Sequence, residues 1–166
     1  MEKAFRAGVL TISDKGSQGL RIDESGKVAA QILEGEGFAI IRQDIVPDKL
    51  QTIADTLVDW ADSGDLALIL TSGGTGLSPS DVTPQAMEQI LDYQVPGMAE
   101  AMRAESLKKT PHAMISRAMA GVRKSCLIIN LPGSPRSVKE NLAVVLPALK
   151  HGLSKLGGDP SDCATP

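Results

Sequence analysis

The chain has 166 residues, a formal net charge of −3 and 42% hydrophobic residues. This length fits one domain, because domains cluster at roughly 100–150 residues, so we expect a single domain over 1–166. Aromatic residues make up only 2%, which predicts an aliphatic core and leaves few rings for base stacking. Without a dense Lys/Arg block, this composition argues against a nucleic-acid-binding protein, although a local basic pocket for a small anion stays open.

Two cysteines, Cys126 and Cys163, lie far apart and lack the close spacing of a metal-binding motif. Cys126 begins an apolar run, so a buried thiol is expected there. No apolar stretch approaches the ~20 residues of a membrane span, and a strand-like segment begins too early for a signal peptide. We therefore expect a cytoplasmic protein without a membrane segment.

The first half of the chain alternates between strand-like and helix-like patterns. Short apolar runs predict buried strands, and apolar residues at helical spacing predict the helices between them. The strands are expected at Ala7–Ile12, Phe38–Val46 and Leu66–Leu70, and the helices at Gly26–Glu34 and from Asp48 to Gly64. A β-α-β-α-β order implies a parallel sheet with right-handed crossovers.

The second half is less regular. Thr83 as N-cap and Pro84 at the first helical position predict a helix through Ile90, and a second helix is expected at Met98–Leu107. Two strands are expected at Ser116–Ala120 and Ser125–Asn130, with Arg117, Arg123 and Lys124 at their flanks in a solubilising role. The last helix is expected at Val138–Leu156 with a turn or kink at Pro147, followed by a surface tail over 157–166.

A glycine-rich segment follows the third predicted strand: Thr71, Ser72, Gly73, Gly74, Thr75 and Gly76. Ligands of parallel sheets bind beyond the carboxyl ends of the strands, which is where this loop should lie. Glycines let backbone N–H groups turn toward phosphate oxygens, and hydroxyls add donors without bulk. The segment lacks the P-loop lysine and does not match GxGxxG, so a tight turn and a phosphate-binding loop both stay open.

Three aspartates follow predicted elements at the same edge. Asp14 comes after the first strand, Asp48 after the second, and Asp81 lies five residues beyond Gly76. Each is consistent with a carboxylate at a helix N-terminus. The alternative for Asp48 and Asp81 is binding of Mg²⁺ beside phosphates, because Mg²⁺ sites combine one or two carboxylates with phosphate oxygens.

A fourth segment, Leu131–Ser137, joins a strand to the last helix and reads LPGSPRS. Its serines precede a helix whose free N–H groups attract anions. Ser137 also suits the N-cap position, with Glu140 completing a capping box.

The ordered set TSGGTG at 71–76, DVTP at 81–84 and LPGSP at 131–135 resembles the molybdopterin adenylyltransferases of molybdenum-cofactor biosynthesis. That family also includes the pterin-binding G domains of plant and animal fusion proteins. The likeness runs along nearly the whole chain. It implies an α/β fold, a three-layer α/β/α sandwich with a mostly parallel sheet, assembled as a homotrimer.

The resemblance also implies transfer of AMP from ATP to molybdopterin, with Mg²⁺ required and pyrophosphate released. It assigns Asp48 and Asp81 as catalytic, Mg²⁺-binding carboxylates. Binding of nucleotide or pterin falls to Ser13, Asp14, the whole 71–76 segment, Pro132, Gly133 and Ser134. Where many family members have Arg before the motif aspartate, this chain has Ser80. A molybdenum-insertion protein is the implied downstream partner.

One alternative is a relative that carries or scaffolds molybdopterin without adenylylating it. The presence of both Asp48 and Asp81 argues against that alternative. A second alternative is molybdenum insertion, which related domains carry out within longer chains.

Overall fold

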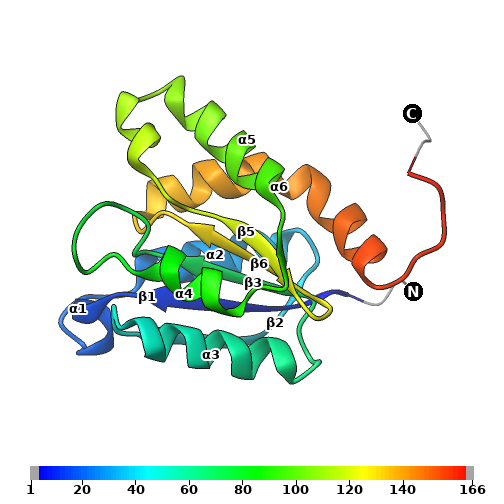
Figure 1. Cartoon of the computed structure of the whole chain (residues 1–166), viewed down its shortest axis with the longest axis horizontal. Coiled ribbons are helices and arrows are strands. Elements are labelled where there is room, and N and C mark those ends of the chain that lie inside the picture. Colours follow the sequence, from blue (N-terminus) through cyan, green and yellow to red (C-terminus); the bar gives the residue numbers. More distant parts are fainter. Residues whose placement is uncertain (1–3, 164–166) are drawn as a thin grey trace.

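The computed structural model describes residues 4–163, in which one sheet is layered between helices (Figure 1). The strands are β1 (Arg6–Ile12), β2 (Ala39–Val46), β3 (Leu68–Ser72), β4 (Tyr93–Gln94), β5 (Ala120–Arg123) and β6 (Cys126–Leu131). The helices are α1 (Asp14–Ser17), α2 (Glu24–Gly35), α3 (Leu50–Asp62), α4 (Thr83–Ile90), α5 (Pro96–Leu107) and α6 (Pro135–Leu156), with a 3-10 helix η1 (Pro111–Ile115).

The strand order β2-β1-β3-β6-β5-β4 confirms a mostly parallel sheet. β1 pairs in parallel with β2 and β3, and β3 pairs in parallel with β6, whereas β4 and β5 add an antiparallel edge. From β1 the chain first forms β2 at one edge of β1 and then returns to form β3 at the other edge. This makes a topological switch point between β1 and β3, where parallel sheets bind their ligands.

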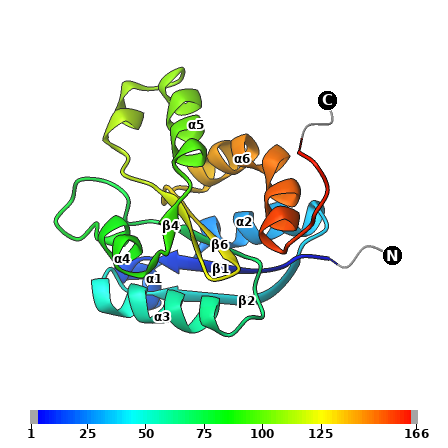
Figure 2. The same ribbon diagram turned by 45° about the vertical axis from the view of Figure 1, so that its right-hand side comes forward.

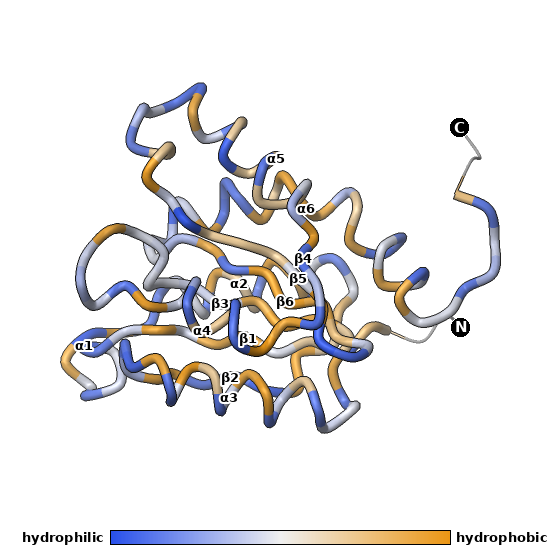
Figure 3. The backbone as a smooth tube through the Cα atoms, in the orientation of Figure 1, coloured by the Kyte–Doolittle hydropathy of each residue, from blue (hydrophilic) through white to orange (hydrophobic). Residues whose placement is uncertain are grey.

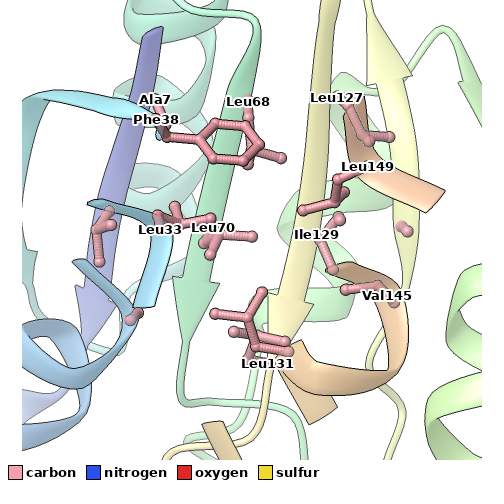
Figure 4. Packing of buried hydrophobic residues seen from close by; sticks show 14 of the residues in the cluster. Ala7, Leu33, Phe38, Leu68, Leu70, Leu127, Ile129, Leu131, Val145 and Leu149 are labelled. Atoms are coloured by element: carbon pink, nitrogen blue, oxygen red, sulfur yellow. The ribbon is translucent and has the colours of Figure 1, made fainter. Parts of the chain in front are cut away.

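Two apolar clusters fill the spaces on either side of the sheet. Helices α2, α5 and α6 cover one face and α3 and α4 the other, as Figures 1 and 2 show. The hydrophobic segments of β1, β3 and β6 run through the middle of the molecule (Figure 3). Leu68 and Leu70 of β3 point into the first cluster (Figure 4), and Ile69 between them belongs to the second. The predicted three-layer α/β/α fold is therefore confirmed.

The strand predicted at Ser116–Ala120 is wrong in position. Strand β5 occupies Ala120–Arg123, the segment expected to connect two strands, and Lys124–Ser125 forms a two-residue turn into β6. Lys124 adopts the left-handed conformation with φ 52°, and its amide donates to Asp92. This turn places Val122 opposite Leu127, so both apolar side chains enter the core.

Several helix starts also differ from the predictions. Helix α2 begins at Glu24 instead of Gly26, and α3 begins at Leu50 instead of Asp48. The N-cap of α4 is Val82 rather than Thr83, whose hydroxyl donates to the Gly73 carbonyl instead. Helix α5 begins at Pro96 instead of Met98. The N-cap of α6 is Ser134 rather than Ser137, because the Ser134 hydroxyl accepts the Ser137 amide at 3.1 Å.

Helix α6 continues through Pro147 without the predicted turn. After it, residues 157–163 are exposed and form neither helix nor strand, and residues 164–166 of the predicted tail lie outside the described residues. Cys126 is fully buried in β6, as predicted. None of the helices within residues 4–163 has the length and apolar character needed to cross a membrane.

Candidate functional site

A cavity of about 670 Å³ opens at the carboxyl ends of β1, β2, β3 and β6. Its size falls within the roughly 300–1,000 Å³ typical of small-molecule sites. The charged residues in its lining are acidic apart from Arg21. The lining residues are Thr11, Ile12, Ser13, Gly16, Arg21, Ile22, Asp23, Glu24, Ser25, Asp48, Ser72, Gly73, Gly74, Asp81, Gly133, Ser134 and Pro135.

Asp48 is held at this edge by Asp14. The Asp14 amide donates to Asp48 Oδ2 and the Asp48 amide donates to Asp14 Oδ1, each at 2.9 Å. The pairing follows from the sheet register, because Ile12 at the end of β1 lies beside Val46 at the end of β2. Asp48 lines the cavity, whereas Asp14 supports it from outside the lining.

Asp81 reaches the same cavity from the loop before α4. Its Oδ2 accepts the Ser78 amide at 3.0 Å, and its own amide donates to the Ser78 carbonyl at 2.8 Å. Burial raises the pKa of Asp48, and the negative charges of Asp14 and Asp81 raise it further, against the lowering effect of the Asp14 amide. The cavity therefore holds concentrated negative charge that a bound cation would relieve.

Gly73 and Gly74 have positive φ values of 105° and 69°. A Cβ on Gly73 would lie 2.3 Å from the backbone oxygen of Ile12, and one on Gly74 would lie 2.3 Å from Thr83 Oγ1. Only glycine fits at these two positions without displacing the neighbours. The loop can thus pack its backbone against β1 and α4 at the edge of the cavity.

Two residues hold all four carbonyl oxygens of the segment 73–76. Thr83 donates its hydroxyl to the Gly73 carbonyl at 3.0 Å and its amide to the Gly74 carbonyl at 3.2 Å. Arg117 donates its amide to the Thr75 carbonyl at 2.8 Å and Nε to the Gly76 carbonyl at 2.9 Å. The role of Arg117 is thus more specific than the solubilising one expected from sequence.

The amides of Gly74, Thr75, Gly76 and Leu77 make no hydrogen bond to any acceptor within residues 4–163. Successive backbone N–H groups with free donors form anion-binding concavities. With its carbonyls turned to Thr83 and Arg117, the segment keeps these donors available. The loop is suited to bind the oxygens of a phosphate.

Sequence reasoning missed the segment between α1 and α2. Asp23 accepts the Thr11 hydroxyl at 2.7 Å and caps α2 through the Gly26 amide at 2.8 Å. The Ser25 hydroxyl lies 3.2 Å from that of Ser72 on the glycine-rich loop. An Asp just before a helix start, as in Asp23-Glu24-Ser25-Gly26, is an N-cap signal, and that signal could have placed Asp23 at this edge of the sheet.

A smaller cavity of about 200 Å³ lies between α5, η1 and α6. The turn from Pro132 to Ser137 separates the two cavities, because Pro132 and Ser137 line the smaller one while Gly133 and Ser134 line the larger. Polar groups in the smaller cavity come from Arg103, Ser106, Lys109, Thr110, His112, Ser116, Ser137, Glu140 and Asn141. Two ligands could therefore meet at this turn.

The structure gathers eight of the residues predicted for the site in the lining of the larger cavity: Ser13, Asp48, Ser72, Gly73, Gly74, Asp81, Gly133 and Ser134. Thr71 and Thr75 are buried instead, and Asn130 donates to the Thr71 hydroxyl at 2.9 Å. Gly76 lies against the Asp81 carboxylate, where a Cβ would come within 2.8 Å of Oδ2. Asp14 holds Asp48 from outside the lining, and Pro132 lines the smaller cavity.

A family model described as "Probable molybdopterin binding domain" matches residues 8–151. The molybdopterin adenylyltransferase of Helicobacter pylori is 38% identical over 159 residues, which cover 95% of this chain and 90% of that protein. Gephyrin of Dictyostelium discoideum is 41% identical over 169 residues, covering 96% of this chain and 23% of gephyrin. The chain thus spans about a quarter of gephyrin, and likewise 26% of the cinnamon protein of Drosophila melanogaster.

Solved structures also match this chain over most of its length. The molybdopterin biosynthesis enzyme MoaB from Thermus thermophilus superimposes with a TM-score of 0.88 at 49% identity. That match covers 95% of this chain and 99% of the MoaB chain. The Mog protein of Mycobacterium ulcerans matches with a TM-score of 0.88 at 35% identity.

Proposed function

This chain belongs to the molybdopterin-binding domain family of molybdenum-cofactor biosynthesis, and on that premise we propose that it transfers AMP from ATP to molybdopterin. The observation that carries this proposal is that Gly74, the first residue of the segment with free amides, lines one cavity together with Asp48 and Asp81. Amides suit phosphate oxygens, and paired carboxylates suit the Mg²⁺ that accompanies ATP.

The carboxylates fit Mg²⁺ by their chemistry. Mg²⁺ takes one or two carboxylates together with phosphate oxygens. Burial, together with the negative charges of Asp14 and Asp81, raises the pKa of Asp48, and a bound cation would favour its ionised form. Asp48 and Asp81 are the residues that would hold the ion. When bound, it would neutralise charge on the phosphates of ATP.

In the proposed reaction a phosphate oxygen of molybdopterin attacks the α-phosphorus of ATP. A new P–O bond forms, the bond from the α-phosphorus to the oxygen bridging to the β-phosphate breaks, and pyrophosphate leaves. The amides of Gly74–Leu77 bind the phosphate oxygens of ATP and stabilise their charge. Alignment of two substrates supplies most of the acceleration, so no protein nucleophile is needed.

The two cavities suit two substrates. We place ATP in the larger cavity, because Ser72–Gly74 of the glycine-rich loop line it together with Asp48 and Asp81. The start of α6 lies between the cavities, and its N–H groups favour an anion such as the pterin phosphate. The smaller cavity, with Ser106, His112 and Asn141 in its lining, offers polar partners for a pterin ring.

The same proposal extends to the chain's organisation. We propose one domain over residues 1–166, a homotrimer in the cytoplasm, and a molybdenum-insertion protein as the partner that receives the product. These statements rest on the family resemblance. Light scattering on the purified chain would test the trimer directly.

The decisive assay incubates the purified chain with ATP, Mg²⁺ and molybdopterin. Adenylylated pterin and pyrophosphate should form in equal amounts, and Asp81→Asn should lower turnover by at least ~10²-fold through loss of a preorganised charge. Tight pterin binding without either product would overturn the proposal and favour a molybdopterin carrier.

A further inference from the structure

Arg117 stands outside the lining of the larger cavity, yet it contacts the loop that carries the cavity's main groups. It lies in the extended segment between η1 and β5 and is half-buried. Its backbone amide and its guanidinium both donate to main-chain carbonyls of the segment 75–81. None of these contacts reaches a side chain that binds substrate in the proposed reaction.

The guanidinium joins the two ends of a turn. Nε donates to the Gly76 carbonyl at 2.9 Å, and Nη2 donates to the Asp81 carbonyl at 2.7 Å. A third donor, Nη1, reaches Gln85 of α4 at 3.2 Å. The planar fork of arginine can make these bonds together, whereas a lysine ammonium acts as a single point charge.

The Arg117 segment is itself fixed from the other side. Arg103 of α5 donates Nη1 to the carbonyls of Ser116 and Ala118, at 3.3 and 2.7 Å. Arg103 and Ser116 also line the smaller cavity. A series of hydrogen bonds therefore runs from the smaller cavity through the Arg117 segment to Asp81.

We propose that Arg117 is a positioning residue that sets the distance between the glycine-rich loop and the Asp81 carboxylate. This inference rests on the proposed function, in which loop amides bind phosphate and Asp81 binds Mg²⁺. Arg117 acts through the carbonyls of Gly76 and Asp81 and touches neither substrate. Without it, the turn from Leu77 to Ser80 would be free to carry Asp81 away from Asp48.

The test compares Arg117→Ala with Arg123→Ala. Arg123 is a matched control because it also binds a carbonyl, that of Ile90 at 2.9 Å, and pairs with Asp62 far from both cavities. Arg117→Ala should lower kcat by ~10²-fold, as misplacement by about 1 Å can. It should also raise the Mg²⁺ concentration that gives half-maximal rate, whereas Arg123→Ala should lower thermal stability and leave that concentration unchanged.

Amide hydrogen exchange gives a readout that does not depend on turnover. The amides of Ser78, Asp81 and Thr83 donate to acceptors within the loop, so Arg117→Ala should speed their exchange while β1 and β3 stay protected. If wild-type protein shows no adenylyl transfer, the proposed function fails, and these three amides still test the positioning role.

Arg117→Lys covers the case in which the alanine variant does not fold. The ammonium can hold one of the two carbonyls, so intermediate exchange rates and a partial recovery of kcat are expected. Unchanged exchange at Ser78 and Asp81 in a folded variant would overturn the inference. An equal shift in Mg²⁺ dependence for Arg123→Ala would overturn it as well.

Discussion

Asp14 and Asp48 exchange two hydrogen bonds, each from the amide of one residue to the carboxylate of the other, and so tie the end of β1 to the end of β2. Only one carboxylate oxygen of Asp48, Oδ2, is used in this exchange. Its Oδ1 faces Gly74, at 3.4 Å from the position of a Cβ on that glycine. One oxygen therefore fixes the side chain while the other stays available to a cation.

The position and the charge of Asp48 can therefore be changed independently by substitution. Asp48→Asn keeps an oxygen that can accept the Asp14 amide but removes the charge, so kcat should fall by ~10²-fold with the fold intact. Asp48→Ala loses both and should also lower the melting temperature relative to Asp48→Asn. Steady-state kinetics and thermal melts check this pair. Near-normal turnover of Asp48→Asn would exclude Asp48 as a Mg²⁺ ligand.

The raised pKa of Asp48 predicts a pH-dependent stability. Because the folded-state pKa lies above the ordinary value of 3.8, the ionised carboxylate destabilises the fold at neutral pH, and this effect disappears below that value. In Mg²⁺-free buffer, Asp48→Asn should therefore melt above wild type at pH 7, with the difference narrowing toward pH 4. Adding Mg²⁺ with nucleotide should stabilise the wild type selectively. A pH-independent difference would contradict ionisation of Asp48 as its cause.

Gly73 should tolerate no side chain. Gly73→Ala places a Cβ 2.3 Å from the Ile12 carbonyl at a φ of 105°, so the loop must shift and ATP binding should weaken by at least ~10-fold. Gly152→Ala in α6 is the matched control, since nothing lies within 4 Å of its Cβ. The control should bind ATP normally and gain up to ~1 kcal/mol from helix propensity. Calorimetric titration with ATP and Mg²⁺ distinguishes the two variants.

Thr83→Val should destabilise the glycine-rich loop, because it removes the hydroxyl that holds the Gly73 carbonyl. Thr83 is fully buried, and valine would fill its space while leaving the Gly73 carbonyl without its hydroxyl donor. Loss of a buried partner costs ~1–3 kcal/mol of unfolding free energy. Thr56→Val, which removes a bond to the Thr52 carbonyl inside α3, should change stability by under ~0.5 kcal/mol. Equal denaturant midpoints for the two variants would contradict this role.

The two cysteines should react very differently. Burial raises the pKa of the Cys126 thiol to about 12, whereas Cys163 is exposed. Because the thiolate is the reactive form, a thiol reagent at pH 8 should modify one cysteine per folded chain and both after unfolding. Mass spectrometry of labelled peptides identifies the site. Rapid labelling of Cys126 in the native state would contradict the packing of β6.

The parallel half of the sheet could be predicted because β1, β3 and β6 are largely apolar runs and the helices have one apolar stripe. The antiparallel edge could not be placed as well. Residues 118–122 carry no polar side chain. The choice of Ala120–Arg123 as the strand therefore depends on pairing with β6 and on a turn at Lys124. Such long-range pairing leaves no periodic signal within one short segment.

The candidate site, like the sheet, could be predicted from the sequence only in part. Asp48, Asp81 and the glycines were predicted because parallel strands bring their carboxyl ends to one edge. The role of Arg117 was not, since a basic residue near a predicted strand has the same local pattern whether it faces solvent or binds carbonyls 41 and 36 residues away. Thr83 was assigned to capping, because its contact with Gly73 exists only once α4 folds against the loop.

A crystal structure of the chain with Mg²⁺ and a non-hydrolysable ATP analogue tests the central claim most directly. We predict that the phosphates lie against the amides of Gly74–Leu77, with the cation between Asp48 and Asp81. A nucleotide bound instead in the smaller cavity beside Arg103 and Asn141, or a cation away from both aspartates, would contradict the account.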